Sequence, residues 1–118
     1  MYREVEFGLG IGKPFMSMPD MLRRTIAQLI NDGWTKDDFY DGQGGSCILG
    51  AEIEALRGYR VMTDDFNHAQ ALLIQTLKDM HPELTAESIP ELNDDPAVTF
   101  QDVIAALEKT VLQLEERG

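Results

Sequence analysis

Apolar residues recur at intervals of three and four in four segments of this chain, and that interval places them on one face of an α-helix. The segments cover residues 17–33, 46–58, 63–80 and about 99–114. Only Val5–Ile11 alternates apolar residues with others in the manner of a β-strand. The pattern therefore predicts an all-α protein.

Residues with a known role at helix ends bound these segments. Ser17 precedes Pro19 and Asp20, which predicts a capped start, because a serine hydroxyl accepts from first-turn amides and proline needs no hydrogen bond there. Gly33 ends that helix, and Thr99 caps the last one. Both helices are therefore delimited by residues adjacent to them.

The second segment, residues 46–58, combines small and large apolar side chains. The small ones give a low-relief face that lets a neighbouring helix approach closely. They are Cys47, Gly50, Ala51 and Ala55. We expect Ile48, Ile53 and Leu56 to widen the buried surface, and this helix to lie at the tightest crossing of the fold.

Two segments fall outside the four helices. Residues 82–98 are predicted as an ordered connector with at most a helical turn at 85–88, because prolines interrupt anything longer. Residues 1–16 are predicted as an extended or β-like arm, which would pair with a second chain to give a homodimer. The expected architecture is a compact four-helix domain over residues 17–118 that follows this arm.

The 118-residue chain carries a formal charge of −11, unevenly distributed. Residues 1–60 hold nine acids against seven bases, giving −2, and residues 61–118 hold twelve acids against three bases, giving −9. An acidic surface repels phosphate backbones, which argues against direct nucleic-acid binding. Three interpretations stay open: a face for a basic protein partner, a mimic of DNA, or a solubilising surface.

Cysteine usage and apolar runs indicate the compartment. The chain has one cysteine, whereas a secreted domain of this size usually carries several. Its N-terminal residues lack the pattern of a signal peptide, and no apolar run approaches the ~20 residues that cross a bilayer. We therefore expect a cytoplasmic protein with no membrane contact.

Cys47 is the foremost candidate for chemistry. It follows the glycine-rich residues 42–46 at a predicted helix start, where the dipole lowers the pKa of an exposed thiol and free amides bind anions. A histidine and an acid would complete a nucleophilic triad. The residues available are His68, His81, Asp64, Asp65 and Asp94. The alternative is a small buried side chain beside a tight turn, and we assign no catalytic residue.

Metal and cofactor sites are not predicted. His68 and His81 stand thirteen positions apart beside one cysteine, which matches no zinc spacing. Asp37–Gly42 resembles the start of a calcium loop, but Phe39 and Ile48 would occupy two ligand positions. We therefore expect no resident metal or cofactor.

Trp34, Phe39 and Tyr40 cluster around the connection between the first two helices. If exposed they would anchor a partner, because aromatic side chains dominate binding hot spots. If buried they would seal one end of the helical domain. They are candidate partner-binding residues beside the acidic C-terminal half.

The order of several motifs resembles a family of small uncharacterised proteins of actinobacteria and their phages. The resemblance rests on Trp34, the segment Cys47-Ile-Leu-Gly-Ala51, Asn93-Asp94 and the helix after Thr99, and it covers residues 20–114. The family often has a cysteine where Thr35 stands and a tryptophan where Leu92 stands, which argues against paired-cysteine chemistry here.

The resemblance implies an architecture rather than an activity. Asn93 would hold the helices in register, or Cys47, Asn93 and Asp94 would together form a ligand site. We expect a non-enzymatic protein that binds an unidentified, basic protein partner, as an accessory or host-modulating factor of phage type. The alternatives are a DNA-mimic inhibitor of a host nucleic-acid-binding protein and a ligand-binding or cysteine-dependent enzyme domain centred on Cys47.

Overall fold

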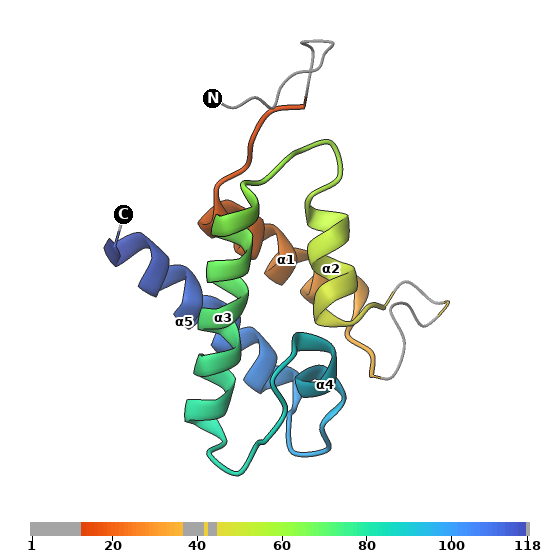
Figure 1. Cartoon of the computed structure of the whole chain (residues 1–118). Helices are drawn as coiled ribbons and strands as arrows, with labels where there is room; N and C mark the ends of the chain where they lie inside the picture. The colour runs from red at the N-terminus through yellow and green to blue at the C-terminus, as the bar shows by residue number, and fades with distance from the viewer. Residues whose placement is uncertain (1–12, 37–41, 43–44, 118) are drawn as a thin grey trace.

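The computed structural model describes residues 13–36, 42 and 45–117. This part of the chain forms five helices and contains no β-strand, so the all-α prediction is confirmed. The helices are α1 (Met18–Asp32), α2 (Ile48–Ala55), α3 (Thr63–Met80), α4 (Ile89–Asp94) and α5 (Phe100–Arg117) (Figure 1). Four of them correspond to the predicted segments, with α5 continuing to Arg117, and α4 makes the predicted count one helix too low.

The helix α4 lies in the segment predicted as a connector. The Ser88 hydroxyl accepts a hydrogen bond from the amide of Glu91, at 3.4 Å, and Pro90 stands in the first turn. Proline is favoured there because its missing N–H has no partner within a helix start. Pro90 therefore begins a helix instead of interrupting one, and the turn predicted at residues 85–88 does not form.

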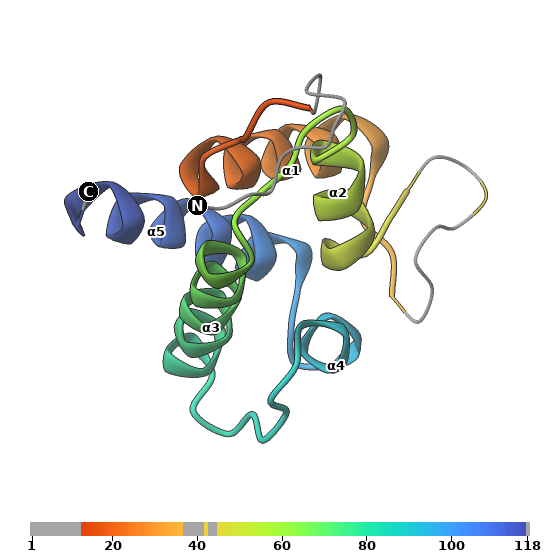
Figure 2. The same cartoon turned by 45° about the horizontal axis from the view of Figure 1, so that its top comes forward.

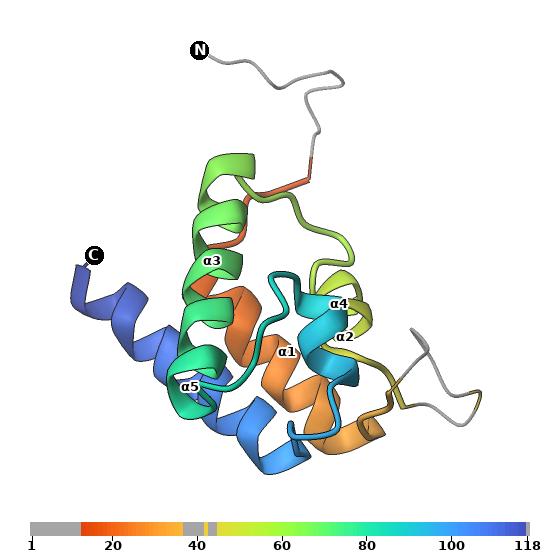
Figure 3. The same ribbon diagram turned by 60° about the horizontal axis from the view of Figure 1, so that its bottom comes forward.

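The helices surround one core. α1 packs against α2 and α5, α3 crosses α5, and the short α4 contacts both α2 and α3 (Figures 2 and 3). The fully buried large apolar side chains come from all five helices and the segment before α5. They are Met21, Leu22, Leu29, Ile48, Leu73, Leu77, Leu92, Val98, Val103 and Leu107.

The predicted caps of α1 and α5 are present. The amide of Asp20 donates to the Ser17 hydroxyl at 3.2 Å, and Gly33 ends α1 with a φ of 97°, a value that suits glycine. Thr99 and Asp102 bond reciprocally at the start of α5, at 3.0 and 3.1 Å, as in a capping box. Local sequence therefore sets both boundaries.

The helix α2 differs from its prediction. It covers Ile48–Ala55 and is therefore shorter than the predicted 46–58. Its buried large positions include Ile48 and Glu52, whereas Ile53 is 53% exposed, so the prediction that Ile53 widens the core is wrong. The helical interval of three and four from Ile48 reaches Ala51, Glu52 and Ala55, which leaves Ile53 on the outer side.

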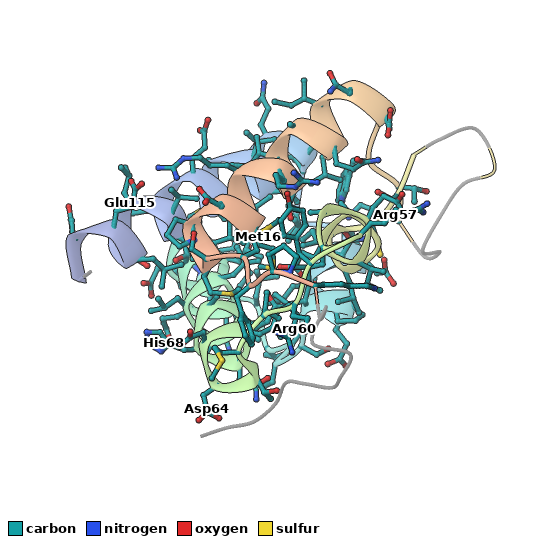
Figure 4. All side chains as sticks on the ribbon, turned by 90° about the horizontal axis from the view of Figure 1, so that it is seen from above. Met16, Arg57, Arg60, Asp64, His68 and Glu115 are labelled. Atoms are coloured by element: carbon teal, nitrogen blue, oxygen red, sulfur yellow. The ribbon has the colours of Figure 1, made fainter. Side chains whose placement is uncertain are left out.

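The N-terminal arm mostly precedes the described residues, so its predicted strand at Val5–Ile11 lies outside them. At residues 13–16 the chain is attached to the domain: Phe15 and Arg60 form an isolated bridge, and Met16 is buried. Figure 4 shows Met16 and Arg60 between the ends of α1, α2 and α3. None of the described helices is long and apolar enough to cross a membrane.

Candidate functional site

The segments on either side of residues 37–44 are joined by backbone hydrogen bonds. Thr35 donates to the carbonyl of Ser46, and Ser46 donates to the carbonyl of Gly33, each at 3.0 Å. This short parallel pairing brings Trp34 beside the start of α2. It thereby places two of the predicted candidate residues, Trp34 and Cys47, at one end of the domain.

Asn93, the next candidate, binds both of these segments from α4. Its side-chain oxygen accepts from the Trp34 indole N–H at 2.6 Å and from the Ile48 amide at 3.0 Å. Its side-chain nitrogen donates to the Thr35 carbonyl and to an Asp94 carboxylate oxygen, both at 3.0 Å. Asn93 is completely buried, and three of the four hydrogen bonds of its amide group link positions 45 to 59 apart.

Lys36 completes what we call the Asn93 network, although no motif or spacing in the sequence points to it. Its ammonium donates to the carbonyls of Asn93 in the last turn of α4 and of Asp95 and Val98 after it, at 2.8–3.0 Å. It also lies 4.6 Å from the centre of the Trp34 ring. A cation at a helix C-terminus is favourable because unpaired carbonyls carry partial negative charge there.

Trp34 is half-buried rather than free to anchor a partner. Its ring stacks on Phe100 at the start of α5, with 5.9 Å between ring centres and 9° between planes. With its N–H bonded to Asn93, both its apolar face and its polar atom are engaged within the fold. The other two aromatic candidates, Phe39 and Tyr40, lie outside the described residues.

Cys47 is buried and acts as the N-cap of α2. Its sulfur accepts a hydrogen bond from the amide of Gly50 at 3.2 Å. The two histidines point elsewhere: His68 projects outward from α3 beside Asp64 (Figure 4), and His81 bonds to Asp102. Among the contacts of the described residues, none joins Cys47 to either histidine, so the imagined triad is not assembled here.

His81 and Asp102 form a separate polar contact between the end of α3 and the start of α5. The ring nitrogen Nε2 lies 2.7 Å from an Asp102 oxygen, and Nδ1 lies 3.5 Å from Glu83. The hydrogen bond with Asp102 raises the pKa of His81. Burial disfavours ionised Asp102, but hydrogen bonds from Thr99 and His81 outweigh it and lower the pKa of Asp102.

Glu52 is a buried ionisable side chain that the sequence motifs did not select. Its side chain is completely buried, and among the described residues its one hydrogen-bond donor is the side-chain nitrogen of Gln70 on α3, at 2.8 Å. Burial raises the pKa of Glu52 to about 8, against a smaller lowering by the Gln70 hydrogen bond. The signal was present in the sequence, because Glu52 stands on the same helical face as Ile48 and Ala55.

A groove of about 480 Å³ runs between α1 and α5. Ile26, Val111 and Leu112 give it an apolar lining. Charged side chains edge it: Arg23, which pairs with Glu115, and Glu108. Leu112 is 59% exposed in this lining, and beside the groove Ile30, one helical turn after Ile26, is 60% exposed. This is an apolar surface that the described part of the chain leaves open.

The residues of the motif resemblance therefore meet in one buried network, and a family comparison covers the same part of the chain. The model of a family of unknown function, DUF6197, matches residues 16–111. The chain belongs to DUF6197. Membership in an uncharacterised family is thus confirmed, and the DUF6197 match spans all five helices except the end of α5.

Other comparisons give no activity to transfer. No curated protein and no solved structure matches this DUF6197 chain. Within its described residues, no group of three or more histidine, cysteine, aspartate or glutamate side chains is arranged to hold a metal ion. The features of this chain that bear on function are therefore the open surface, the buried network and the charges.

Proposed function

We propose that this protein acts by binding another protein, without catalysis, and that the partner docks in the groove between α1 and α5. The observation that carries this is the pair Ile30 and Leu112, each more than half exposed beside an apolar-lined groove. Single exposed apolar residues are ordinary, but large ones that gather beside a concave apolar surface are typical of interaction sites.

The chemistry of the partner follows from the rim of the groove. Glu108 and Glu115 lie on it, and α5 belongs to the half of the chain with a formal charge of −9. A basic segment with an apolar side chain fits both features: the apolar group enters beside Leu112, and the basic groups face the carboxylates. Figure 4 shows Glu115 at the outer side of this surface.

The buried network supports binding over chemistry at the motif residues. Trp34, Cys47 and Asn93 use their polar atoms inside the fold, as donors and acceptors that hold loop and helix starts in place. In this proposal the motif builds the scaffold, and the scaffold sets the spacing of α1 and α5. The resemblance to small actinobacterial and phage proteins adds that the protein is a cytoplasmic accessory or host-modulating factor with a host protein as partner.

A DNA mimic is the second candidate, favoured by the exposed carboxylates of residues 61–117. The exposed acids there are Asp64, Asp65, Asp79, Glu83, Glu87, Glu91, Glu108, Glu115 and Glu116. A mimic would place several of them in the phosphate-binding sites of a nucleic-acid-binding protein. Its affinity would collapse as salt rises, whereas an apolar anchor is only mildly weakened by salt.

Affinity capture from native cytosol tests the groove when it compares three forms of the protein. We expect wild type and Ile53→Glu to retain the same partner, because Ile53 is as exposed as Leu112 but lies on α2 away from the groove. Leu112→Glu should reduce retention at least about tenfold, the scale of one interface hot spot. If all three forms capture the partner equally, the groove is not its docking site. If moderate salt alone releases the partner from wild type, the DNA-mimic alternative is favoured.

A further inference from the structure

Glu52 occupies a position that the helical pattern of α2 assigns to the core. It is completely buried, with Ile48 one turn before it and Ala55 one turn after it. An isolated ionised carboxylate in such a place is costly, because burial removes the water that stabilises its charge. The bonding of this side chain therefore needs an explanation.

The hydrogen bonds around Glu52 leave two acceptors without a donor. The nitrogen Nε2 of Gln70 donates to Oε1 of Glu52 at 2.8 Å. The other oxygen of each side chain, Oε2 of Glu52 and Oε1 of Gln70, is buried and has no partner among the described residues. Two acceptors cannot bond to each other, so an ionised Glu52 leaves both unsatisfied.

We propose that the folded protein binds a proton on Oε2 of Glu52, and that the resulting O–H donates to Oε1 of Gln70. A carboxylic acid and a primary amide then form a cyclic pair with two parallel hydrogen bonds. One proton satisfies both unpaired atoms and removes the buried charge. The site is thus a proton-binding site, formed by one side chain from α2 and one from α3.

The electrostatic surroundings agree with a neutral acid. Burial raises the pKa of Glu52 to about 8, the Gln70 hydrogen bond opposes this, and no charged group of the described chain contributes. The elements around α2 carry several charged and titratable groups. They are Arg24 on α1, Glu54 on α2, Arg57 and Arg60 between α2 and α3, His68 on α3, and Glu91 and Asp94 on α4. Arg24 donates to the Ala55 carbonyl, Arg57 pairs with Glu54, and His68 is exposed.

The proton also couples two helices. α2 packs mainly on α1, and α3 packs mainly on α5, so the pair of Glu52 and Gln70 is a direct polar link between α2 and α3. When the acid releases its proton to solvent, the O–H donor is lost and a buried negative charge replaces it. Alkaline pH should therefore loosen α2 from α3 in the folded protein.

Carbon-13 NMR of the full chain, labelled at glutamate side-chain carboxyls, tests the protonation directly. The signal absent in Glu52→Gln identifies Glu52, and Glu54→Gln is the matched control on the same helix. We expect the Glu52 signal to report a neutral acid at pH 7 and to titrate near 8. A Glu52 signal that titrates in the ordinary glutamate range, around 4.3, would overturn the proposal.

Hydrogen exchange tests the coupling of the helices, after correction for the intrinsic effect of pH. In wild type, protection of the α2 amides should fall at least about tenfold more between pH 6 and pH 9 than in Glu52→Gln. Glutamine keeps both hydrogen bonds of the cyclic pair and carries no ionisable proton. Equal losses in the two proteins would show that the link does not depend on this proton.

Discussion

The Asn93 network and the Glu52–Gln70 pair are two buried polar regions with different degrees of hydrogen bonding. Asn93 uses both side-chain atoms fully, and its partners Trp34 and Ile48 are satisfied by the same contacts. Glu52 and Gln70 share one bond and leave one acceptor each unpaired. Both regions contact α2, one at its start and one at its centre.

Buried polar side chains therefore have two different effects in this protein. A fully bonded neutral amide stabilises one arrangement of segments, because each removed bond leaves a buried group unsatisfied. A carboxyl with one neutral partner makes stability depend on pH, because its charged and neutral forms differ in cost. The motif residues therefore act as a pH-independent clamp, while Glu52 adds a pH-dependent contact to the same helix.

Of the substitutions considered, Asn93→Ala should lower the free energy of unfolding the most. It leaves the Trp34 N–H, the Ile48 amide and the Thr35 carbonyl without their partner. At ~1–3 kcal/mol for each unsatisfied group, the free energy of unfolding should fall by about 5 kcal/mol. Denaturant unfolding measures this, with the exposed Asn67→Ala as control; a loss similar to the control would mean that the network is not a clamp.

Glu52→Gln should stabilise the protein at alkaline pH. The folded pKa of Glu52 is raised to about 8, above the ordinary 4.5, so the folded state binds more protons than the unfolded state between these values. Stability is therefore full below the unfolded pKa and declines as pH rises to about 8. The variant should equal wild type near pH 4 and exceed it by about 4 kcal/mol at pH 8.

The control for this variant is Glu54→Gln on the same helix, which should leave the pH dependence of wild type unchanged. Unfolding free energies of the three proteins across pH 4–9 provide the measurement. If the two proteins differ in unfolding free energy by the same amount at every pH, Glu52 does not make stability depend on pH, because a change in packing alone is independent of pH.

Lys36→Met should lower the free energy of unfolding by an intermediate amount, through the Asn93 network alone. The substitution keeps an apolar stem against Trp34 but removes three hydrogen bonds to carbonyls at and after the end of α4. We expect a loss of about 2 kcal/mol, since bonds from a charged donor to half-buried acceptors exceed ordinary ones. Denaturant unfolding tests it against the exposed Lys109→Met, and no difference between the two would remove Lys36 from the network.

Removing the contact between His81 and Asp102 should change stability the least. The change should depend on pH in the manner of a histidine side chain. Since the pKa of His81 is raised, its contribution is full below the ordinary histidine pKa of about 6.5 and is lost as pH rises through the raised value. The melting temperature of His81→Gln should thus lie below that of wild type near pH 6 and converge with it near pH 9. Convergence at the acidic end instead would reverse the assigned sign.

Sequence alone predicts the local features of this fold. Ser17, Gly33 and Thr99 mark helix ends as expected, because a cap needs only residues three or four positions away. Pro90 is misread because the same residue breaks a helix interior and starts a helix, and only the tertiary contacts of α4 decide which. Boundaries set by neighbours are predictable, and those set by packing are not.

The candidate site is predicted less completely, for a related reason. Motif resemblance selects Trp34, Cys47 and Asn93. However, Asn93 bonds to Trp34 and to Ile48 across 59 and 45 positions, and no local rule gives that geometry. Lys36 carries no motif signal at all. Glu52 could be found from its interval of four residues after Ile48, yet the pattern of apolar residues alone passes over it in favour of Ile53.

Proton uptake during folding tests the central contrast most directly. Unfolded protein is refolded at pH 7 in weak buffer with a pH indicator, and the uptake by Glu52→Gln is subtracted from that of wild type. Since Glu52 is ionised in the unfolded chain and protonated in the folded one, the difference should be about one proton per molecule. A difference near zero would mean that Glu52 folds as a carboxylate, and it would contradict the distinction drawn between the two buried regions.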